Sequence, residues 1–350
     1  MPNWLRRVAV TQTLLCTLGL CCTAGAQDAA TFDPDGTAHI TRIVPQPALV
    51  SKEARAWLDS LTHLNRGPQT LQERRVSTDA WRAQDSAEAL KHYPVTIHST
   101  TLAGVQIDEI TPLQMPPENR NRVFINLHGG GFNADSGSRI EGDPIANLAH
   151  TEVISVYYRL APEHPFPAAV EDVIAVYQAL LKTHAPKNIA IYGTSAGAIL
   201  TGEVAVKLKQ LKLPLPAALG VFSGGGDFSR VGDSRQLFTL DGLPGALQPT
   251  LDKTLPDGEY VGRTSRRDPV LSPLFADLSG LPPTLLVTST RDMLLGDTTT
   301  LHRALLRQGV DARLVVYEAL PHAFWYHFEF PETREALELM AHFLDSTVGH

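Results

Sequence analysis

Along most of the chain, short apolar runs alternate with segments whose apolar residues recur at helical spacing. The apolar runs predict strands at 95–101, 105–110, 122–127, 153–158, 188–192, 217–222, 284–288 and 313–317. The helical spacing predicts helices at 167–182, 196–211, 298–307 and 332–344. Because buried strands that alternate with helices form a parallel sheet covered on both faces, the pattern predicts an α/β fold with a mainly parallel sheet.

The N-terminal region departs from this alternation. Residues 27–50 have no sustained periodicity and contain three prolines, so an irregular segment is predicted there. From Ser51 to Lys91 the pattern is helical, with Ser51 as the candidate N-cap of a first helix and Trp81 in a second. We therefore separate a helical region at 27–93 from a main domain at 94–350. The helical region is either a cap over an active site or a packing appendage, and the sequence leaves both open.

A second departure lies at 224–268, where glycines, prolines and polar residues replace the alternation. A loop this long inside a compact domain is uncommon and often has a function. We interpret it as an insertion near the active site.

The first 26 residues have the layout of a secretory signal peptide. Arg6 and Arg7 form a positive start, residues 8–20 are mostly apolar, and 24–26 offer a small-residue cleavage site. A membrane anchor needs about 20 apolar residues, and this run is shorter. The segment predicts a periplasmic or secreted protein with no stable membrane span after cleavage. All three cysteines lie within it, so the mature chain is expected to lack disulfides and thiol chemistry.

The amino-acid composition argues against some classes of function. With 43% hydrophobic and 19% charged residues, the chain reads as a soluble globular protein. The net charge is -7 and the basic residues are scattered, which argues against a nucleic-acid partner. The oligomeric state stays open, a homodimer included.

The segment Gly193–Gly197 is a G-x-S-x-G motif with Ser195 at its centre. The motif alone is weak evidence, but it follows an apolar strand and opens a helix. A nucleophile elbow needs this arrangement, because a tight strand-to-helix turn exposes the serine and the glycines avoid clashes in the bend. The sequence therefore predicts Ser195 as the nucleophile of an acyl-transfer reaction.

A glycine run at His128–Phe132 follows the strand that ends at residue 127. Hydrolases with such an elbow place a backbone donor in the loop after this strand. We predict an oxyanion hole formed by the amides of Gly130, Gly131 and Ala196, each such donor contributing about 3–4 kcal/mol in the transition state. His128 is expected to orient this loop rather than to act as a base.

The acid of a catalytic triad is expected just after a later strand. Asp292 follows the strand at 284–288, at the strand edge where open α/β sheets bind ligands. Two other aspartates compete: Asp297 lies where a helix begins and suits capping, and Asp268 precedes a proline and suits a turn. Asp292 is the predicted acid.

The base is expected to follow the acid in the chain. His322 comes after the strand at 313–317, which places it at the same sheet edge. His327 and His302 lie in aromatic or helical surroundings that favour core or surface roles. His322 is the predicted base, because serine becomes nucleophilic only when an oriented imidazole takes its proton. This chemistry needs no cofactor, and no H-E-x-x-H metal motif is present.

Together these segments resemble the hormone-sensitive-lipase family of bacterial esterases, from about residue 123 to the C-terminus. The resemblance rests on the segments 128–132, 158–168 (Y-R-L-A-P-E-H-P-F-P-A), 193–197, 268–274 (D-P-V-L-S-P-L) and the surroundings of Asp292 and His322. It implies an α/β-hydrolase fold with an eight-stranded sheet, an N-terminal helical cap and cofactor-independent hydrolysis of short-chain acyl esters. Within 158–168 we expect a structural role, with Arg159 paired to Glu163.

Two positions depart from the family pattern. Tyr157 stands where an aspartate is common, and 224–227 is G-G-G-D where bulkier residues are usual. These departures leave the predicted triad intact but make it unsafe to transfer a substrate from a relative. A lactone or aryl-ester hydrolase, and a ligand-binding protein that has lost catalysis, remain as alternatives to the short-chain esterase.

Overall fold

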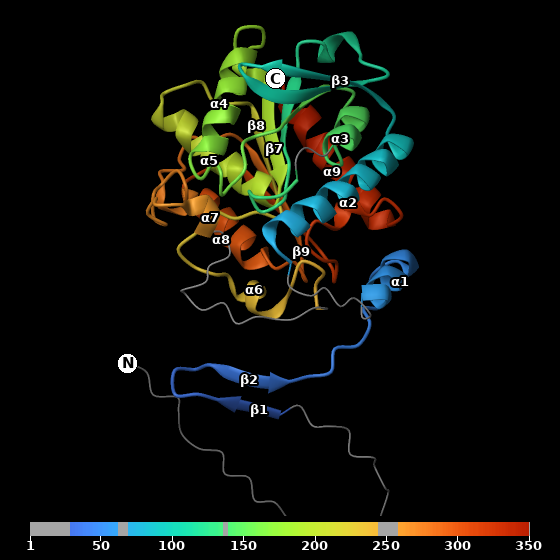
Figure 1. Cartoon of the computed structure of the whole chain (residues 1–350), viewed down its shortest axis with the longest axis vertical. Coiled ribbons are helices and arrows are strands. Elements are labelled where there is room, and N and C mark those ends of the chain that lie inside the picture. Colours follow the sequence, from blue (N-terminus) through green and yellow to red (C-terminus); the bar gives the residue numbers. More distant parts are fainter. Residues whose placement is uncertain (1–28, 62–68, 136–138, 244–257, 350) are drawn as a thin grey trace, which may run out of the picture. The chain divides into compact units, whose positions relative to one another are not determined.

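The computed structural model describes residues 29–61, 69–135, 139–243 and 258–349 (Figure 1). Its centre is an eight-stranded sheet with the order β10-β9-β8-β7-β5-β6-β4-β3. The strands are β3 (Val95–Leu102), β4 (Val105–Pro112), β5 (Val123–Leu127), β6 (Glu152–Val156), β7 (Ile189–Thr194), β8 (Ala218–Phe222), β9 (Thr284–Ser289) and β10 (Ala312–Tyr317). Pairing is parallel from β10 to β6 and antiparallel at β4 and β3. The predicted mainly parallel sheet is confirmed.

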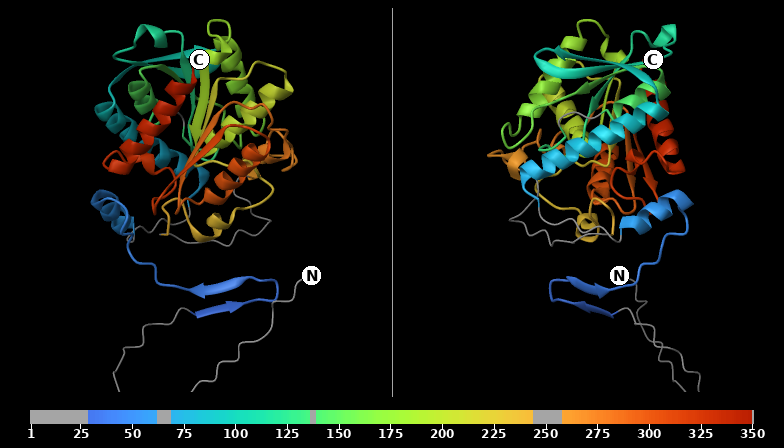
Figure 2. Two further views of the ribbon diagram at one scale, coloured as in Figure 1. Left: turned by 180° about the vertical axis from the view of Figure 1, so that it is seen from behind. Right: turned by 45° about the vertical axis from the view of Figure 1, so that its right-hand side comes forward.

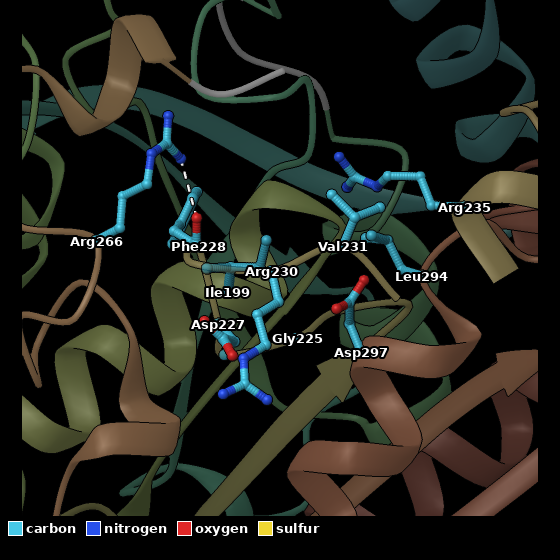
Figure 3. Close-up of a pocket in the computed structure, with 11 residues that line it drawn as sticks. Ile199, Gly225, Asp227, Phe228, Arg230, Val231, Arg235, Arg266, Leu294 and Asp297 are labelled. Carbon is cyan, nitrogen blue, oxygen red and sulfur yellow. Dashed lines mark hydrogen bonds between the residues drawn. The ribbon is translucent and has the colours of Figure 1, made fainter. Parts of the chain in front are cut away.

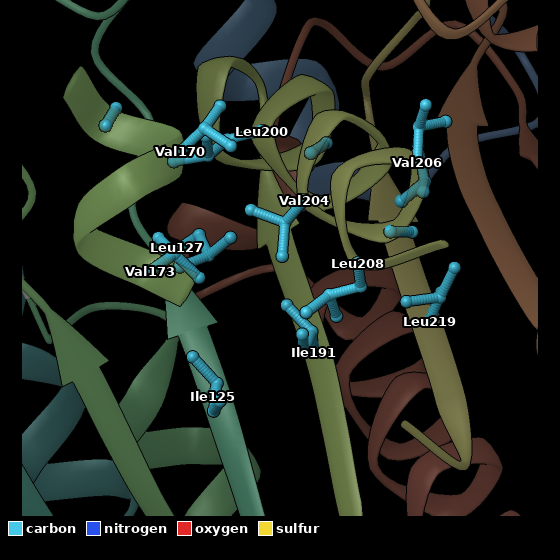
Figure 4. Packing of buried hydrophobic residues seen from close by; sticks show 14 of the residues in the cluster. Ile125, Leu127, Val170, Val173, Ile191, Leu200, Val204, Val206, Leu208 and Leu219 are labelled. Carbon is cyan, nitrogen blue, oxygen red and sulfur yellow. The ribbon is translucent and has the colours of Figure 1, made fainter. Parts of the chain in front are cut away.

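Helices cover both faces of this sheet (Figure 2). One face carries α4 (Ala168–Leu180), α5 (Ala196–Gln210) and α8 (Leu295–Arg307), and the other carries α3 (Gly142–Ala149) and α9 (Pro331–Thr347). Alternate residues of β5 point to opposite layers, as a strand requires: Ile125 and Leu127 join the α4–α5 core, drawn in Figure 4, whereas Phe124 joins the α3–α9 core. Two hydrophobic cores therefore hold the strand ends rigidly in place.

Helix α3 and a two-stranded hairpin near the N-terminus were not expected from the pattern. Helix α3 has only eight residues, which include Gly142 and Pro144, so its sequence is too short to reveal a helical period. Residues 27–50 were predicted to be irregular, which is wrong in part, because β1 (Ala29–Phe32) and β2 (Ala38–Thr41) form an antiparallel hairpin. Its turn contains Pro34-Asp35-Gly36, a turn signal that the periodicity analysis did not use. This hairpin belongs to a separate compact unit, residues 1–46, which also contains the predicted signal peptide at 1–26, outside the described residues.

The helices predicted before the first strand of the main sheet are present. Helix α1 (Lys52–Ser60) has Ser51 as its N-cap, whose hydroxyl accepts from the Ala54 amide at 3.1 Å. Helix α2 (Leu71–His92) begins with a capping box between Thr70 and Glu73. No helix in the described part of the chain combines the length and the apolar character needed to cross a bilayer.

The remaining elements are short. They are α6 (Asp233–Leu237), α7 (Gly258–Val261) and the 3-10 turns η2 (Pro117–Asn119), η3 (Pro186–Asn188), η5 (Pro273–Phe275) and η6 (Phe324–Tyr326). Both α6 and α7 lie within the segment 224–268, of which 244–257 is outside the described residues.

The expected pairing within 158–168 is wrong. Arg159 binds Asp172 at 2.8 Å, because the first turns of α4 fold back over it. Glu163 instead forms a two-pronged ion pair with Arg75 of α2, with N–O distances of 2.7 and 2.8 Å. The segment therefore has a structural role, but it connects the main domain to α2 rather than closing on itself.

Candidate active site

Ser195 occupies the single residue between β7 and α5. Its backbone has φ 58° and ψ -119°, a conformation that is costly for a residue with a side chain. Two hydrogen bonds hold it there: the Ser195 amide donates to the Phe222 carbonyl of β8 at 2.9 Å, and its carbonyl accepts from the Ile199 amide at 3.1 Å. The strained turn projects the serine at the N-terminus of α5, where the helix dipole favours developing negative charge.

Glycines flank the serine because the chain passes too close for a side chain. A Cβ on Gly197 would lie 1.8 Å from the Leu127 carbonyl oxygen, and one on Gly193 would lie 2.4 Å from the same atom. Leu127 is the last residue of β5, directly before the glycine run at 128–132. The two glycines thus bring the elbow against the predicted oxyanion loop.

We expect Gly197→Ala to lower the melting temperature by at least ~5 °C, because the new methyl must push α5 away from backbone rather than from a flexible side chain. Gly202→Ala, on the same helix, is the matched control. Its Cβ would meet only Pro273 at 3.4 Å, an ordinary contact, so this variant should keep or slightly raise stability. Thermal unfolding followed by circular dichroism measures both, and equal melting temperatures would contradict the close-approach argument.

The glycine loop after β5 lies beside the nucleophile. The point that a Cβ of Gly129 would occupy is 3.4 Å from the Ser195 Cβ. Gly130 and Gly131 have φ values of 105° and 65°, which glycine adopts at little cost. Ala196 begins α5, so its amide has no partner within the helix. The structure therefore places the glycine loop, which carries the predicted donors Gly130 and Gly131, next to the serine that precedes Ala196.

His128 is buried at the start of this loop. Its Nδ1 lies 2.8 Å from the Gly129 carbonyl oxygen, and its ring stacks on Tyr158 with centroids 4.2 Å apart. The Tyr158 hydroxyl donates to the His128 carbonyl at 2.7 Å. Burial lowers the pKa of His128 below its ordinary value, which keeps the ring neutral. These contacts suit the predicted orienting role.

His322 and Asp292 meet at the carboxyl ends of the parallel strands. His322 follows β10 and Asp292 follows β9, and the His322 Nδ1 lies 2.8 Å from Asp292 Oδ1. Both side chains are buried. Within the described residues, the other imidazole nitrogen, Nε2, has no hydrogen-bond partner. One nitrogen is thus held by the carboxylate, and the other remains available to a serine hydroxyl.

The environment of Asp292 favours its ionised form. Its Oδ2 accepts hydrogen bonds from the hydroxyls of Ser223 and Thr288, the latter at 2.8 Å, and its Oδ1 accepts from the Leu294 amide at 2.8 Å. Burial alone would raise the pKa of Asp292, but the His322 charge and these hydrogen bonds outweigh it and hold the pKa below its ordinary value. A carboxylate that stays charged can stabilise an imidazolium beside it.

The rival residues have other roles. Asp268 Oδ1 accepts from the amides of Val270 and Leu271, which makes it a turn residue. Asp297 lies in the first turn of α8, whose N-cap is Leu294 rather than Asp297. His302 Nε2 is 3.2 Å from the Ala312 carbonyl oxygen.

His327 is also accounted for by packing. Its ring lies 4.2 Å from the Trp57 ring, and burial lowers the pKa of His327 to about 4. None of these contacts connects a rival residue to Ser195 or to Asp292.

Three supporting side chains escaped the sequence analysis. Ser223 and Thr288 orient Asp292, and Trp325 Nε1 donates to the Thr194 hydroxyl at 3.2 Å, which connects the histidine loop to the elbow. The sequence signal was a polar residue directly after an apolar run, as with Thr288 after Leu285–Val287 in β9. Such a residue suggests a buried partner but does not identify it.

The segment after β8 lines a pocket together with the elbow helix (Figure 3). Ile199, one helical turn after Ser195, and Leu294, two residues after Asp292, belong to its wall. The other lining residues are Gly225, Gly226, Asp227, Phe228, Arg230, Val231, Arg235, Arg266 and Asp297. Side chains on Gly224 or Gly225 would collide with Ala198 or Asp297. The G-G-G-D departure noted in the sequence therefore lets this segment pack against α5 and α8.

Among the described residues, no group of three or more histidine, cysteine, aspartate or glutamate side chains is arranged to hold a metal ion.

Comparison with known proteins agrees with this fold. The family model described as alpha/beta hydrolase fold matches residues 124–326. An acetyl-hydrolase of Streptomyces hygroscopicus is 34% identical over 67% of this chain and 79% of its own length. An esterase of Acinetobacter venetianus is 31% identical over 72% of this chain and 82% of its own length.

Solved structures of esterases superpose on this chain. The crystal structure of an esterase E25 superposes with a TM-score of 0.74 at 33% identity, covering 88% of this chain and 98% of that one. An esterase from the bacterial hormone-sensitive lipase family superposes with a TM-score of 0.74 at 29% identity, covering 85% and 99%.

Proposed function

This chain belongs to the alpha/beta hydrolase family and is a carboxylic ester hydrolase, and we propose that it cleaves short-chain acyl esters through Ser195, His322 and Asp292. The observation that carries the proposal is the His322–Asp292 contact of 2.8 Å at the strand ends beside a strained serine elbow. Chain order, strand position and the hydrogen-bonded pair agree with the roles of nucleophile, base and acid.

The proposed reaction has two steps. His322 Nε2 takes the proton of Ser195 as the hydroxyl oxygen attacks the ester carbonyl, and the imidazolium then gives that proton to the leaving alcohol. Water, activated by the same nitrogen, attacks the acyl-serine and releases the acid. Asp292 remains ionised throughout and fixes the imidazole with its proton on Nδ1, so that Nε2 faces the serine.

The negative charge of the tetrahedral intermediate develops next to the glycine loop. The amides of Gly130, Gly131 and Ala196 are the proposed donors. Two observations support this proposal: the loop contacts the elbow, and the first amides of α5 have no partner within the helix. Because these groups belong to a rigid backbone, they need no reorganisation during the reaction.

We further propose that the pocket beside Ile199 receives the acyl group. In the part of the chain that the structure describes, its lining carries three arginines, two aspartates and four larger apolar side chains, Ile199, Phe228, Val231 and Leu294. Each methylene of an acyl chain gains about 0.8 kcal/mol only when it is buried against apolar surface. A wall this polar gives a long alkyl chain little such surface, which supports a preference for short acyl groups.

Hydrolysis of nitrophenyl acetate, butyrate and decanoate tests this preference with the leaving group held constant. We expect kcat/KM for acetate or butyrate to exceed that for decanoate by at least about tenfold, since the longer chain gains no apolar burial. Absorbance of released nitrophenol gives the rates, at substrate concentrations below the onset of micelles. A decanoate rate equal to or above the butyrate rate would contradict the short-chain proposal without affecting the proposed nucleophile.

A further inference from the structure

Helix α2 lies against the glycine loop through three arginines on one side of the helix. Arg74 Nη2 donates to the Gly130 carbonyl at 3.2 Å, and Arg75 Nε donates to the Asn133 carbonyl at 2.7 Å. The third, Arg82, is 6% exposed and enters the interior. The N-terminal helix therefore contacts the backbone that carries the proposed oxyanion donors.

Arg82 reaches close to the nucleophile. Its Nη2 and the Ser195 Cβ each lie 3.4 Å from the point that a Cβ of Gly129 would occupy, so the two groups are no farther apart than twice that distance. On the loop side, Arg82 Nε is 3.1 Å from Asp135 Oδ2, and both side chains are buried. The guanidinium thus lies beside Gly129 of the glycine loop, close to the Ser195 side chain.

The same guanidinium also contacts the histidine loop. Its central carbon is 4.3 Å from the ring centre of Tyr326, four residues after His322. The Tyr326 hydroxyl donates to the buried carboxylate of Glu141. Arg82 is therefore placed between two loops, one that carries the proposed oxyanion hole and one that carries the proposed base.

The glycine loop needs such external support. Phe132 and Asp135 have φ values of 64° and 72°, which side-chain-bearing residues adopt only when their surroundings impose it. Gly130 and Gly131 add two more positive φ angles, so the loop has little intrinsic preference for this shape. Arg82 binds the side chain of Asp135, one of the two strained positions, and thereby opposes relaxation of the loop.

The guanidinium stays charged in this interior. Burial opposes the charge of Arg82, but Tyr326, Asp135 and Glu141 outweigh it and raise the pKa of Arg82 above its ordinary value. Burial raises the pKa of Glu141 to about 7, against the opposing effects of Arg82 and of hydrogen bonds from Tyr326 and Asn126. Asp135, whose Oδ2 lies 3.1 Å from Arg82 Nε, is the loop carboxylate that pairs with this guanidinium.

We propose that Arg82 of helix α2 is a positioning residue of the ester hydrolase. It fixes the positions of the 129–135 loop and the His322 loop relative to Ser195. The N-terminal helix α2 thereby supports the geometry needed for catalysis. The expected effect on kcat rests on the proposed function, whereas the expected effect on the position of the 129–135 loop does not.

The test compares Arg82→Met and Arg82→Lys with Lys91→Met, an exposed position on the same helix whose ammonium pairs with Glu88. We expect Arg82→Met to lower kcat for nitrophenyl acetate by about 10- to 100-fold with KM changed by less than about threefold, because misplacement of the donors affects the transition state most. Arg82→Lys should recover part of the loss. Lys91→Met should match the wild type.

Hydrogen exchange, read by mass spectrometry, provides a second measurement that does not depend on activity. Peptides covering 129–135 should exchange faster in Arg82→Met, and peptides of the C-terminal half of α5 should not. If Arg82→Met fails to fold, Asp135→Asn replaces it in the test. This variant keeps the arginine and removes its charged partner. It should lower kcat and speed loop exchange in the same direction, by smaller amounts.

The outcomes separate the two proposals. Unchanged exchange in the loop together with kcat within twofold of the wild type would overturn the role of Arg82. Faster loop exchange in a protein whose wild type does not hydrolyse the esters would overturn the proposed function and leave the positioning role standing. A parallel loss of kcat and of loop protection, with partial recovery in the lysine variant, supports both.

Discussion

Ser195→Ala is expected to reduce kcat for nitrophenyl acetate by roughly 10⁴- to 10⁶-fold, because no acyl-enzyme can form. The change removes one oxygen from a side chain that caps no helix amide. The backbone bonds of residue 195 to Phe222 and Ile199 do not involve that oxygen and remain. We therefore expect a melting temperature close to the wild-type value, so that lost activity can be assigned to chemistry rather than to unfolding.

Two controls accompany this variant. Ser346→Ala, in the last turn of α9 far along the chain from the elbow, should retain wild-type activity. A fluorophosphonate should label the wild type once, on the peptide that contains Ser195, and should not label Ser195→Ala. Equal hydrolysis by the wild type and Ser195→Ala would show that another residue is the nucleophile.

The sequence was sufficient where a function depends on local order. The elbow could be predicted because Gly193–Gly197 lies between an apolar strand and a helix, and the structure has β7 end at Thr194 and α5 begin at Ala196. The meeting of Asp292 and His322 could be predicted because the carboxyl ends of parallel strands share one edge of the sheet. These inferences need only element order and strand direction.

The sequence was insufficient where pairs form between distant segments. Glu163 binds Arg75, 88 residues away, rather than Arg159, because the position of α2 against the main domain is a tertiary property. The hydroxyl of Ser223 reaches Asp292 because β8 and β9 are neighbours in the sheet, 69 residues apart in sequence. Helix α3 was missed for another reason, since eight residues that include Gly142 and Pro144 are too few to reveal a helical period.

Among the three triad positions, the acid was the one that the sequence left most open. One substitution, Asp292→Asn, tests it. Asp292→Asn is expected to lower kcat by about 10⁴-fold with a small change in KM. The asparagine amide can donate a hydrogen bond to His322 Nδ1, which would move the imidazole proton to Nε2. A protonated Nε2 cannot accept the proton of Ser195, so the nucleophile stays unactivated although its position is preserved.

Asp268→Asn is the matched control, because Asp268 was one of the two rival acids and loses the same charge. Its Oδ1 serves the amides of Val270 and Leu271, and the amide oxygen of asparagine can accept the same bonds. Activity within about threefold of the wild type is therefore expected for this variant. Steady-state kinetics on both variants decide between the two aspartates, with melting temperatures to verify folding. A loss of activity confined to Asp268→Asn would reject Asp292 as the acid, whereas loss confined to Asp292→Asn would leave the hydrogen-bonded carboxylate as the group that orients His322.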